Sequence, residues 1–123
     1  MLEVYSENVT VTENEAIPFN NVSLKKGCTA ELSGTSTIQL NKCGVYMISV
    51  DASATESTTL QLYKNGVAQP QAQSTGGTPA FTTLVQVSDN NYCCACASPT
   101  TLQVVSIDGA TLTNCNLVVT KLV

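Results

Sequence analysis

Residues 42–51 read Lys-Cys-Gly-Val-Tyr-Met-Ile-Ser-Val-Asp, in which a turn is followed by an almost unbroken run of β-favouring side chains. Side chains alternate across a strand with period two, so Tyr46, Ile48 and Val50 share one face. Met47 lies between them on the opposite face, which makes both faces partly apolar. We therefore expect a central strand that faces a second sheet on one side and another protein chain on the other.

The rest of the chain also alternates over short distances and shows no helical periodicity. No stretch repeats apolar residues at the i, i+3 and i+4 positions of an amphipathic helix. Turn signals such as Asn65-Gly66, which is typical of a hairpin, recur every ~8–12 residues. This pattern predicts an all-β sandwich or barrel. We interpret residues 68–80 as a loop with some extended backbone and residues 92–97 as a cysteine-rich strand.

The composition favours a subunit of a larger assembly. The chain has 123 residues, a length typical of one domain with one hydrophobic core. Charged residues make up only 11% of it, well below the roughly 25% of ordinary soluble proteins. Thr, Ser, Asn and Gln take their place, and these side chains cost far less to bury against a neighbour than charges do. A monomeric sandwich of low charge is the alternative.

Charge and apolar run length exclude two classes of partner. The formal net charge is −4, and the five lysines are scattered along a chain without arginine, so we expect no nucleic-acid partner. No apolar run approaches the ~20 residues that span a bilayer, which predicts no membrane insertion. No basic segment followed by an apolar one opens the chain, so we expect no signal peptide and a protein made in the cytoplasm.

The residue types that catalysis needs are missing or isolated. The chain has no His, which is the commonest general base, and no Ser-x-x-Lys or Gly-x-Ser-x-Gly pattern. Its acidic residues are scattered, and the oxygen-rich run Asp89-Asn90-Asn91 is typical of a turn. We therefore expect a protein that is not an enzyme, with no catalytic residue, no cofactor and no metal site.

The six cysteines leave more than one interpretation open. Their even number suggests a disulfide framework, for example a Cys28–Cys43 bond or a bond that involves Cys115. The expected cytoplasmic synthesis and a core of adequate size favour reduced cysteines packed as small apolar side chains. A metal site is disfavoured because His and paired Cys-x2-Cys elements are absent.

Five short motifs follow one another in an order that resembles a known family. They are an apolar-Pro-Phe segment at residues 17–19, a Gly-x-Tyr strand at 44–49, a Leu-x-Leu-x-x-Asn-Gly hairpin at 60–66, an apolar strand at 83–85 and a final strand that ends with Lys-Leu at 121–122. Over residues 16–123 this series is similar to the C1q/TNF-like jelly rolls. The similarity is greatest to the bacterial and phage versions that cap collagen-like fibres or spore-surface filaments.

The resemblance implies a jelly-roll β-sandwich of about ten strands that assembles as a homotrimer. It divides the chain into residues 1–16, an arm or first strand with a docking role, and residues 17–123, the jelly-roll domain. Two departures stand out, namely the absence of a collagen-like stalk and the three cysteines within residues 92–97. The residues expected to pack in the core or across the trimer are Tyr46, Ile48, Phe81, Leu84 and Leu122.

These observations together suggest a structural virion protein of a bacteriophage. We expect a trimeric capsid decoration or short head fibre on the capsid surface, made in the host cytoplasm, whose partner is the major capsid protein or another virion protein. One alternative is an adhesion head for a host receptor or surface glycan, with residues 68–80 as the contact region. The other is the tip of a bacterial spore-surface filament.

Overall fold

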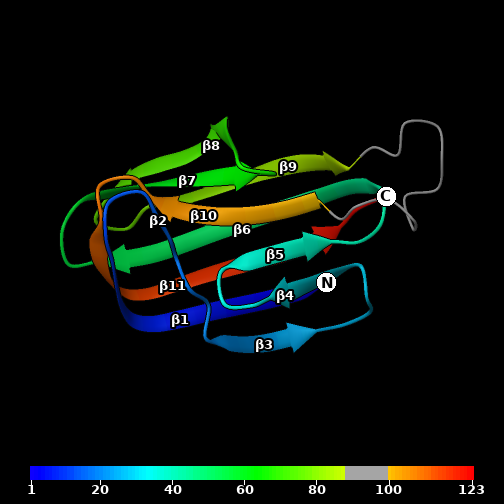
Figure 1. Cartoon of the computed structure of the whole chain (residues 1–123), viewed down its shortest axis with the longest axis horizontal. Coiled ribbons are helices and arrows are strands. Elements are labelled where there is room, and N and C mark those ends of the chain that lie inside the picture. Colours follow the sequence, from blue (N-terminus) through cyan, green and yellow to red (C-terminus); the bar gives the residue numbers. More distant parts are fainter. Residues whose placement is uncertain (88–99) are drawn as a thin grey trace.

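The computed structural model describes residues 1–87 and 100–123, which form two antiparallel sheets packed face to face (Figure 1). Sheet A has the strand order β3-β1-β11-β6-β9. Sheet B has the order β4-β5-β10-β7-β8, and the short strand β2 also pairs with β10. The predicted all-β sandwich is confirmed. The described residues contain eleven strands, where the sequence suggested about ten.

The strands of sheet A are β1 (Leu2–Val11), β3 (Asn21–Lys25), β6 (Gly44–Ala54), β9 (Ala80–Val87) and β11 (Ala110–Lys121). The strands of sheet B are β2 (Glu15–Ala16), β4 (Ala30–Ser33), β5 (Thr37–Leu40), β7 (Thr58–Lys64), β8 (Val67–Gly76) and β10 (Thr100–Ser106).

Strand β6 lies inside sheet A and carries the alternation that the sequence predicts. Tyr46 and Ile48 are 0% exposed and face sheet B, while Met47 between them is half-buried on the opposite face. The register places Ile48 opposite Val119 of β11 and Thr83 of β9. Period-two alternation therefore divides β6 into a core face and an outer face.

The core fills the space between the sheets with aliphatic side chains from nearly every strand. Branched side chains suit this position because they pack well against a pleated surface. No buried side-chain nitrogen or oxygen among the described residues lacks a hydrogen-bond partner. The largest fully buried side chains are Tyr46, Phe19, Leu2, Ile17, Ile38, Leu40, Ile48, Leu60, Leu62, Leu102, Leu112 and Leu117.

The segment Ile17-Pro18-Phe19 crosses from sheet B to sheet A. Ile17 and Phe19 are 0% and 1% exposed, so both side chains are buried in the core where the chain crosses between the sheets. The Ile17 amide donates to the Val104 carbonyl at 2.8 Å, and the Ser6 hydroxyl donates to the Pro18 carbonyl. Pro18, which has no amide hydrogen to donate to a ladder, falls between strands β2 and β3.

Residues 68–80 are mostly strand, and the expectation of a loop there was wrong. Asn65 and Gly66 have φ values of 51° and 80°, so they form the predicted hairpin turn that returns the chain as β8. The register of β7 and β8 shifts between the pairs Gln61↔Gln73 and Tyr63↔Ala68. The shift leaves four residues of β8 opposite one residue of β7, and this bulge masked the strand pattern in the sequence.

Residues 1–16 contribute directly to the two sheets. Strand β1 lies between β3 and β11 in the interior of sheet A, and β2 pairs with β10 in sheet B. The predicted turn at residues 88–91 and the predicted cysteine-rich strand at residues 92–97 lie outside the described residues.

The end of the chain extends the β6–β11 ladder. The Leu122 amide donates to the Val45 carbonyl at 2.7 Å, and the Val45 amide donates to the Val123 oxygen at 3.3 Å. Gly44 has a φ of 145°, and a Cβ at this position would overlap the Val123 oxygen and the Lys121 side chain. Glycine is required here because the terminal residues pass directly over its backbone.

Candidate assembly surface

The outer face of sheet A, on the side away from the core, presents apolar side chains on several neighbouring strands. They come from the alternate residues of β6, β9, β11 and β1 that the core does not use. Met47 lies opposite Leu84 on β9 and Thr120 on β11, while Val118 lies opposite Ser49. The outer face of sheet A is defined below by Tyr5, Val45, Met47, Leu84 and Val118.

Mostly neutral polar groups surround these apolar side chains, together with the carboxylates of Glu3 on β1 and of the exposed Asp51 on β6. Ser49 and Thr82 share a hydrogen bond of 3.2 Å across β6 and β9. At the other side the Asn116 amide donates to a Glu3 carboxylate oxygen at 3.3 Å, which satisfies part of the nearest charge. Hydroxyl and amide groups that are already paired cost little to bury, so another protein surface can cover this face.

Leu84 marks the part of this face that is most open to solvent. Its side chain is 58% exposed in the middle of β9, although leucine is a residue that proteins usually bury. Met47, its cross-strand neighbour on β6, is half-buried, and so is Val118 on β11, the next strand beyond β6. Contiguous exposure of this kind across three strands is typical of a protein–protein contact.

The five residues singled out from the sequence fall into two groups. Tyr46 and Ile48 lie in the core at 0% exposure, and Phe81 is partly buried against the core. Leu84 and Leu122 are 58% and 49% exposed, so the fold leaves them available to a partner. The structure separates residues that the sequence grouped together, because only the register assigns each one to a face.

Sequence reasoning did not single out Tyr5 and Val118 as surface candidates. Val118 lies in the terminal hydrophobic run, where Leu117 and Val119 point into the core and Val118 points outward. The sequence signal for Val118 is an apolar residue at the outward position of a strand. This signal could not be used because the pairing of the strand, which decides which position is outward, was unknown. Tyr5 follows the same rule on β1, where Val4 and Ser6 are buried.

Tyr46 anchors β6 to the preceding turn. Its ring is fully buried, and its hydroxyl donates to the Lys42 carbonyl at 2.6 Å. Burial raises the pKa of this phenol above its usual value, and the hydrogen bond to the backbone partly offsets the rise. Tyr46 therefore remains a neutral donor that fixes the start of β6.

The cysteines differ from the pairing suggested above. Cys28 carries a free thiol in the exposed loop before β4, so the suggested Cys28–Cys43 disulfide is not formed. Cys43 is disulfide-bonded, so the expectation of a reduced thiol packed as an apolar side chain is wrong at that position. Cys115 is a free buried thiol opposite Ser6 and Ala52, and burial together with the Asp51 charge raises its pKa to about 12. Cys93, Cys94 and Cys96 lie outside the described residues.

The described part of the chain offers no small-molecule pocket, metal site or membrane-spanning helix. Residues 1–87 and 100–123 form no pocket and contain no group of three or more residues that could hold a metal ion. They also contain no helix long and apolar enough to span a bilayer.

Comparison with known proteins gives matches at the level of the fold. No family model and no curated protein sequence matches the chain. Among solved structures, the globular domain of zebrafish complement 1qA protein is similar with a TM-score of 0.78 and 10% identity, over 99% of this chain and 96% of that one. The PRD1 vertex protein P5 is similar with a TM-score of 0.68 and 12% identity, over 99% and 96% of the two chains.

A third similar structure extends the range of proteins that share this architecture. Rabbit GITRL has a TM-score of 0.63 and 10% identity, over 100% of this chain and 95% of that one. Identities this low establish the fold and leave the function open. The two five-membered strand paths, the core between them and these similarities show that the chain adopts a C1q/TNF-like jelly-roll fold.

Proposed function

We propose that this protein is a structural component of a bacteriophage virion. It forms a homotrimer that decorates the capsid surface or heads a short fibre, held by the major capsid protein or another virion protein. The observation that carries the proposal is the outer face of sheet A, where Leu84 is 58% exposed beside the half-buried Met47, and Val118 on the strand beyond is half-buried as well. A protein whose role is to fit against other subunits needs such a face and needs no catalytic group.

The energetics of this face support self-association. Covering a leucine side chain completely contributes about 1.5–3 kcal/mol, and Leu84 has more than half of its surface to lose. Three copies related by a threefold axis can each cover this face with part of a neighbour. A stable contact needs roughly 1,000 Å² or more of buried surface, which the outer faces of five strands can supply.

The particle-bound role is supported by the similarity to the PRD1 vertex protein P5 and by avidity. A trimer offers three copies of any docking contact to a symmetric position on a particle. A linked set of weak contacts binds ~10²–10⁴-fold more tightly than one contact alone. Each docking contact can therefore remain small.

Native mass spectrometry of the full chain at micromolar concentration tests the trimer. We expect a trimer for the unaltered protein and a monomer for the double variant Met47→Lys/Leu84→Lys, because two charges on the outer face of sheet A would have to be desolvated at the contact. The matched control is Gln71→Lys/Gln73→Lys on the exposed strand β8, which we expect to remain trimeric. A monomeric mass for the unaltered protein, or a trimer for the β6/β9 variant, contradicts the assembly.

Imaging of purified virions with and without this protein tests the location. We expect density of trimer size on the capsid or at a fibre head that disappears when the protein is absent. Identical particles in both preparations would contradict the virion role and leave the trimer result unaffected.

A second candidate, an adhesion head, is favoured by the bulge at Gln69-Pro70-Gln71-Ala72 on strand β8. Gln61 is 7% exposed, and its side-chain amide donates to the Gln69 carbonyl and, at 3.2 Å, to the Ala72 carbonyl. This buried anchor holds Pro70 and Gln71 outward as an ordered, uncharged projection. The neutral side-chain amide of Gln71 can form hydrogen bonds with the hydroxyl groups of a surface glycan.

A glycan array with the full chain tests this second role. Binding that is lost in the Gln71→Ala variant and kept in Thr35→Ala, an exposed position on another turn, would support adhesion through the bulge. An array without hits removes this candidate.

A further inference from the structure

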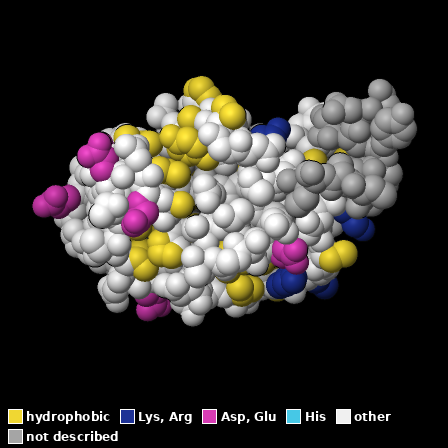
Figure 2. Space-filling view, viewed as in Figure 1, with side chains coloured by type: hydrophobic (Ala, Val, Ile, Leu, Met, Phe, Trp, Pro, Cys, Tyr) yellow, Lys and Arg dark blue, Asp and Glu magenta, His cyan; other side chains and the backbone are white. Residues whose placement is uncertain are grey.

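The charged side chains of this protein are separated along its long axis. All five lysines lie at the end that holds both termini, on or beside the loops and strand ends there. Four of the nine acidic residues lie at the opposite end, in or directly beside the turns between β1 and β2, β6 and β7, and β10 and β11, while Glu7 and Asp51 lie within strands β1 and β6. Figure 2 shows most of the magenta side chains on the left and the dark blue ones on the right. The lysine end is Lys25, Lys26, Lys42, Lys64 and Lys121, and the acidic end is Glu13, Glu15, Glu56 and Asp108.

The acidic end is a single surface built from three adjacent turns. The Asn14 amide donates to the Ser106 carbonyl at 2.8 Å, and residues 12–13 pack directly against Gly109. The Thr55 amide donates to the Thr111 carbonyl at 3.0 Å, which brings the third turn alongside. All four acidic side chains are exposed, and no lysine lies among these turns.

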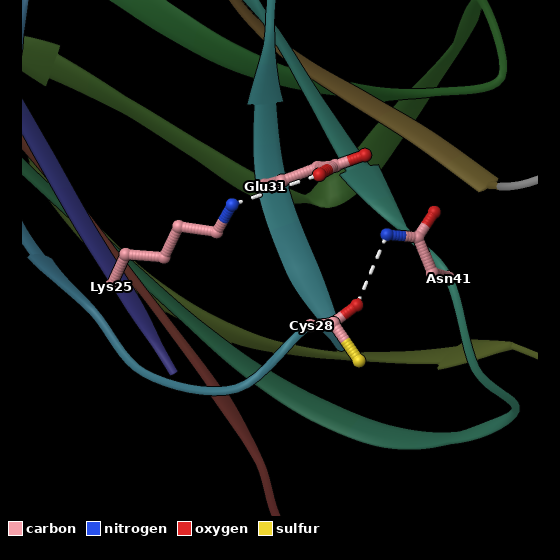
Figure 3. A network of polar contacts seen from close by, with 4 residues as sticks. All are labelled: Lys25, Cys28, Glu31 and Asn41. Carbon is pink, nitrogen blue, oxygen red and sulfur yellow. Dashed lines mark hydrogen bonds and ion pairs between the residues drawn. The ribbon is translucent and has the colours of Figure 1, made fainter.

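The lysine end is also held together by contacts between loops. The Asn41 side chain donates to the Cys28 carbonyl at 3.2 Å, and the Lys25 ammonium lies 3.7 Å from Glu31 (Figure 3). This is the only ion pair within residues 1–87 and 100–123. Among the described residues, Glu3 and Glu31 also lie at this end, so five positive side chains and two negative ones leave a balance of +3 there, against −4 at the acidic end.

The two ends are too far apart to neutralise each other. Strand β6 runs along the axis for 11 residues, or about 36 Å at ~3.3 Å per residue. The Debye length is only about 10 Å at 0.1 M salt, so an approaching molecule senses each end separately. A separation of this kind gives the molecule two opposite charged surfaces that are available to partners.

We propose that copies of this protein associate end to end, with the lysine end of one unit against the acidic end of the next. Another copy is the partner that complements both ends at once, whereas a polyanion such as nucleic acid would match the lysine end alone. A contact between two different surfaces of identical units closes into a ring or repeats as a filament, and surfaces at opposite ends of one long axis favour the open line. The inference holds for a single copy and for the proposed trimer, whose parallel subunits would present three like ends on each side.

Sedimentation velocity of the full chain over a range of salt concentrations tests this association. At about 10 mM salt, where the Debye length is about 30 Å, we expect species at multiples of the basic unit, and at about 1 M, where it is about 3 Å, only that unit. The unit mass at high salt reports the trimer independently, so failure of end-to-end association and failure of the proposed trimer give different results.

Charge-reversed variants identify the surfaces involved. Lys25→Glu/Lys26→Glu/Lys42→Glu and Glu13→Lys/Glu15→Lys/Asp108→Lys should each remain at the unit mass alone at low salt. Mixed in equal amounts, they should associate again, because each then supplies the end that the other lacks. Absence of multiples for the unaltered protein, or a mixture that stays at the unit mass, overturns the proposal.

A neutralised variant controls for net charge. Lys25→Gln/Lys26→Gln/Lys42→Gln and Thr35→Glu/Gln71→Glu/Gln73→Glu carry the same net charge of −7, which is −4 less 3, but only the first alters an end. We expect the first to lose at least about tenfold in association constant and the second to keep its multiples at low salt. Equal loss in both would mean that net charge alone governs association, which contradicts the proposal.

Discussion

The two faces of sheet A are made from the same strands and meet different environments. On the inner face of β6, Tyr46 and Ile48 are 0% exposed and pack against sheet B. On the outer face, Met47 is half-buried and its neighbour Leu84 is 58% exposed. Met47 and Leu84 are as apolar as the core side chains, so the difference in their exposure comes from what covers them. The inner face stabilises the fold of one chain, and the outer face is available to other chains.

Matched truncations on the two faces give the largest expected difference. Ile48→Ala should lower the free energy of unfolding by about 2–5 kcal/mol, because it leaves a cavity in a close-packed core. Met47→Ala should cost about 1 kcal/mol or less, since solvent already reaches this side chain. Urea unfolding of both variants, in conditions where they share one oligomeric state, measures the difference. Equal losses would contradict the assignment of the faces.

Gly44 tests the place where the terminal residues close over the start of β6. Gly44→Ala should cost about 1–3 kcal/mol for the unfavourable φ of 145°, with a further cost from the overlap with the Val123 oxygen. Gly66→Ala meets no nearby atoms and has a φ of 80°, so it controls for the conformational cost alone. Thermal unfolding of the two variants separates the cost of atomic overlap from the cost of backbone strain. Equal shifts in Tm would show that the terminal residues move away from the added Cβ at no cost in stability.

Gln61 is a polar residue on the outer side of sheet B that is nevertheless buried. It therefore departs from the contrast between a buried inner face and an exposed outer face. Gln61→Ala should cost about 1–3 kcal/mol, because the Gln69 and Ala72 carbonyls lose their donor. The exposed Gln73→Ala is the matched control and should change stability by less than about 0.5 kcal/mol. The rate of hydrogen exchange across residues 67–76 should rise in Gln61→Ala alone. An unchanged rate would show that the bulge keeps its structure without the Gln61 hydrogen bonds.

Cys115 gives the smallest expected effect near neutral pH, because its contribution changes only at alkaline pH. Its pKa is raised from 9.0 to about 12, so the folded state holds the thiol proton more tightly than the unfolded state does. The stabilisation is complete below pH 9.0 and is lost as the pH rises toward about 12. Tyr46, whose pKa is also raised, adds to the loss in the same direction.

Comparison with a variant that lacks the thiol isolates this contribution. Between about pH 8 and about pH 11 the stability of the unaltered protein should fall more steeply than that of Cys115→Ala. Alkylation followed by peptide mass spectrometry should label the exposed Cys28 well before Cys115 in the folded protein. Parallel pH curves, or equal labelling of the two thiols, would contradict the burial of Cys115.

The prediction of local structure succeeded where alternation was regular and failed where it was interrupted. The strand at residues 44–54 and the turn at Asn65-Gly66 were predictable, because period-two alternation and a pair that tolerates positive φ are local signals. Strand β8 was missed because its four-residue bulge and Pro70 break the alternation. Gln61, the residue that stabilises this bulge, lies on the neighbouring strand and gives no local signal there.

By itself the sequence determined the fold class, the core face of β6 and the scarcity of charge, because these follow from residue type and from spacing along the chain. Only the tertiary structure decided that Leu84 and Met47 lie side by side on an open face, that Cys28 and Cys43 are not joined, and that lysines and acidic residues gather at opposite ends. Each of these facts joins residues far apart in the sequence. Which residues meet depends on strand order and register, which are set by the packing of the whole sandwich.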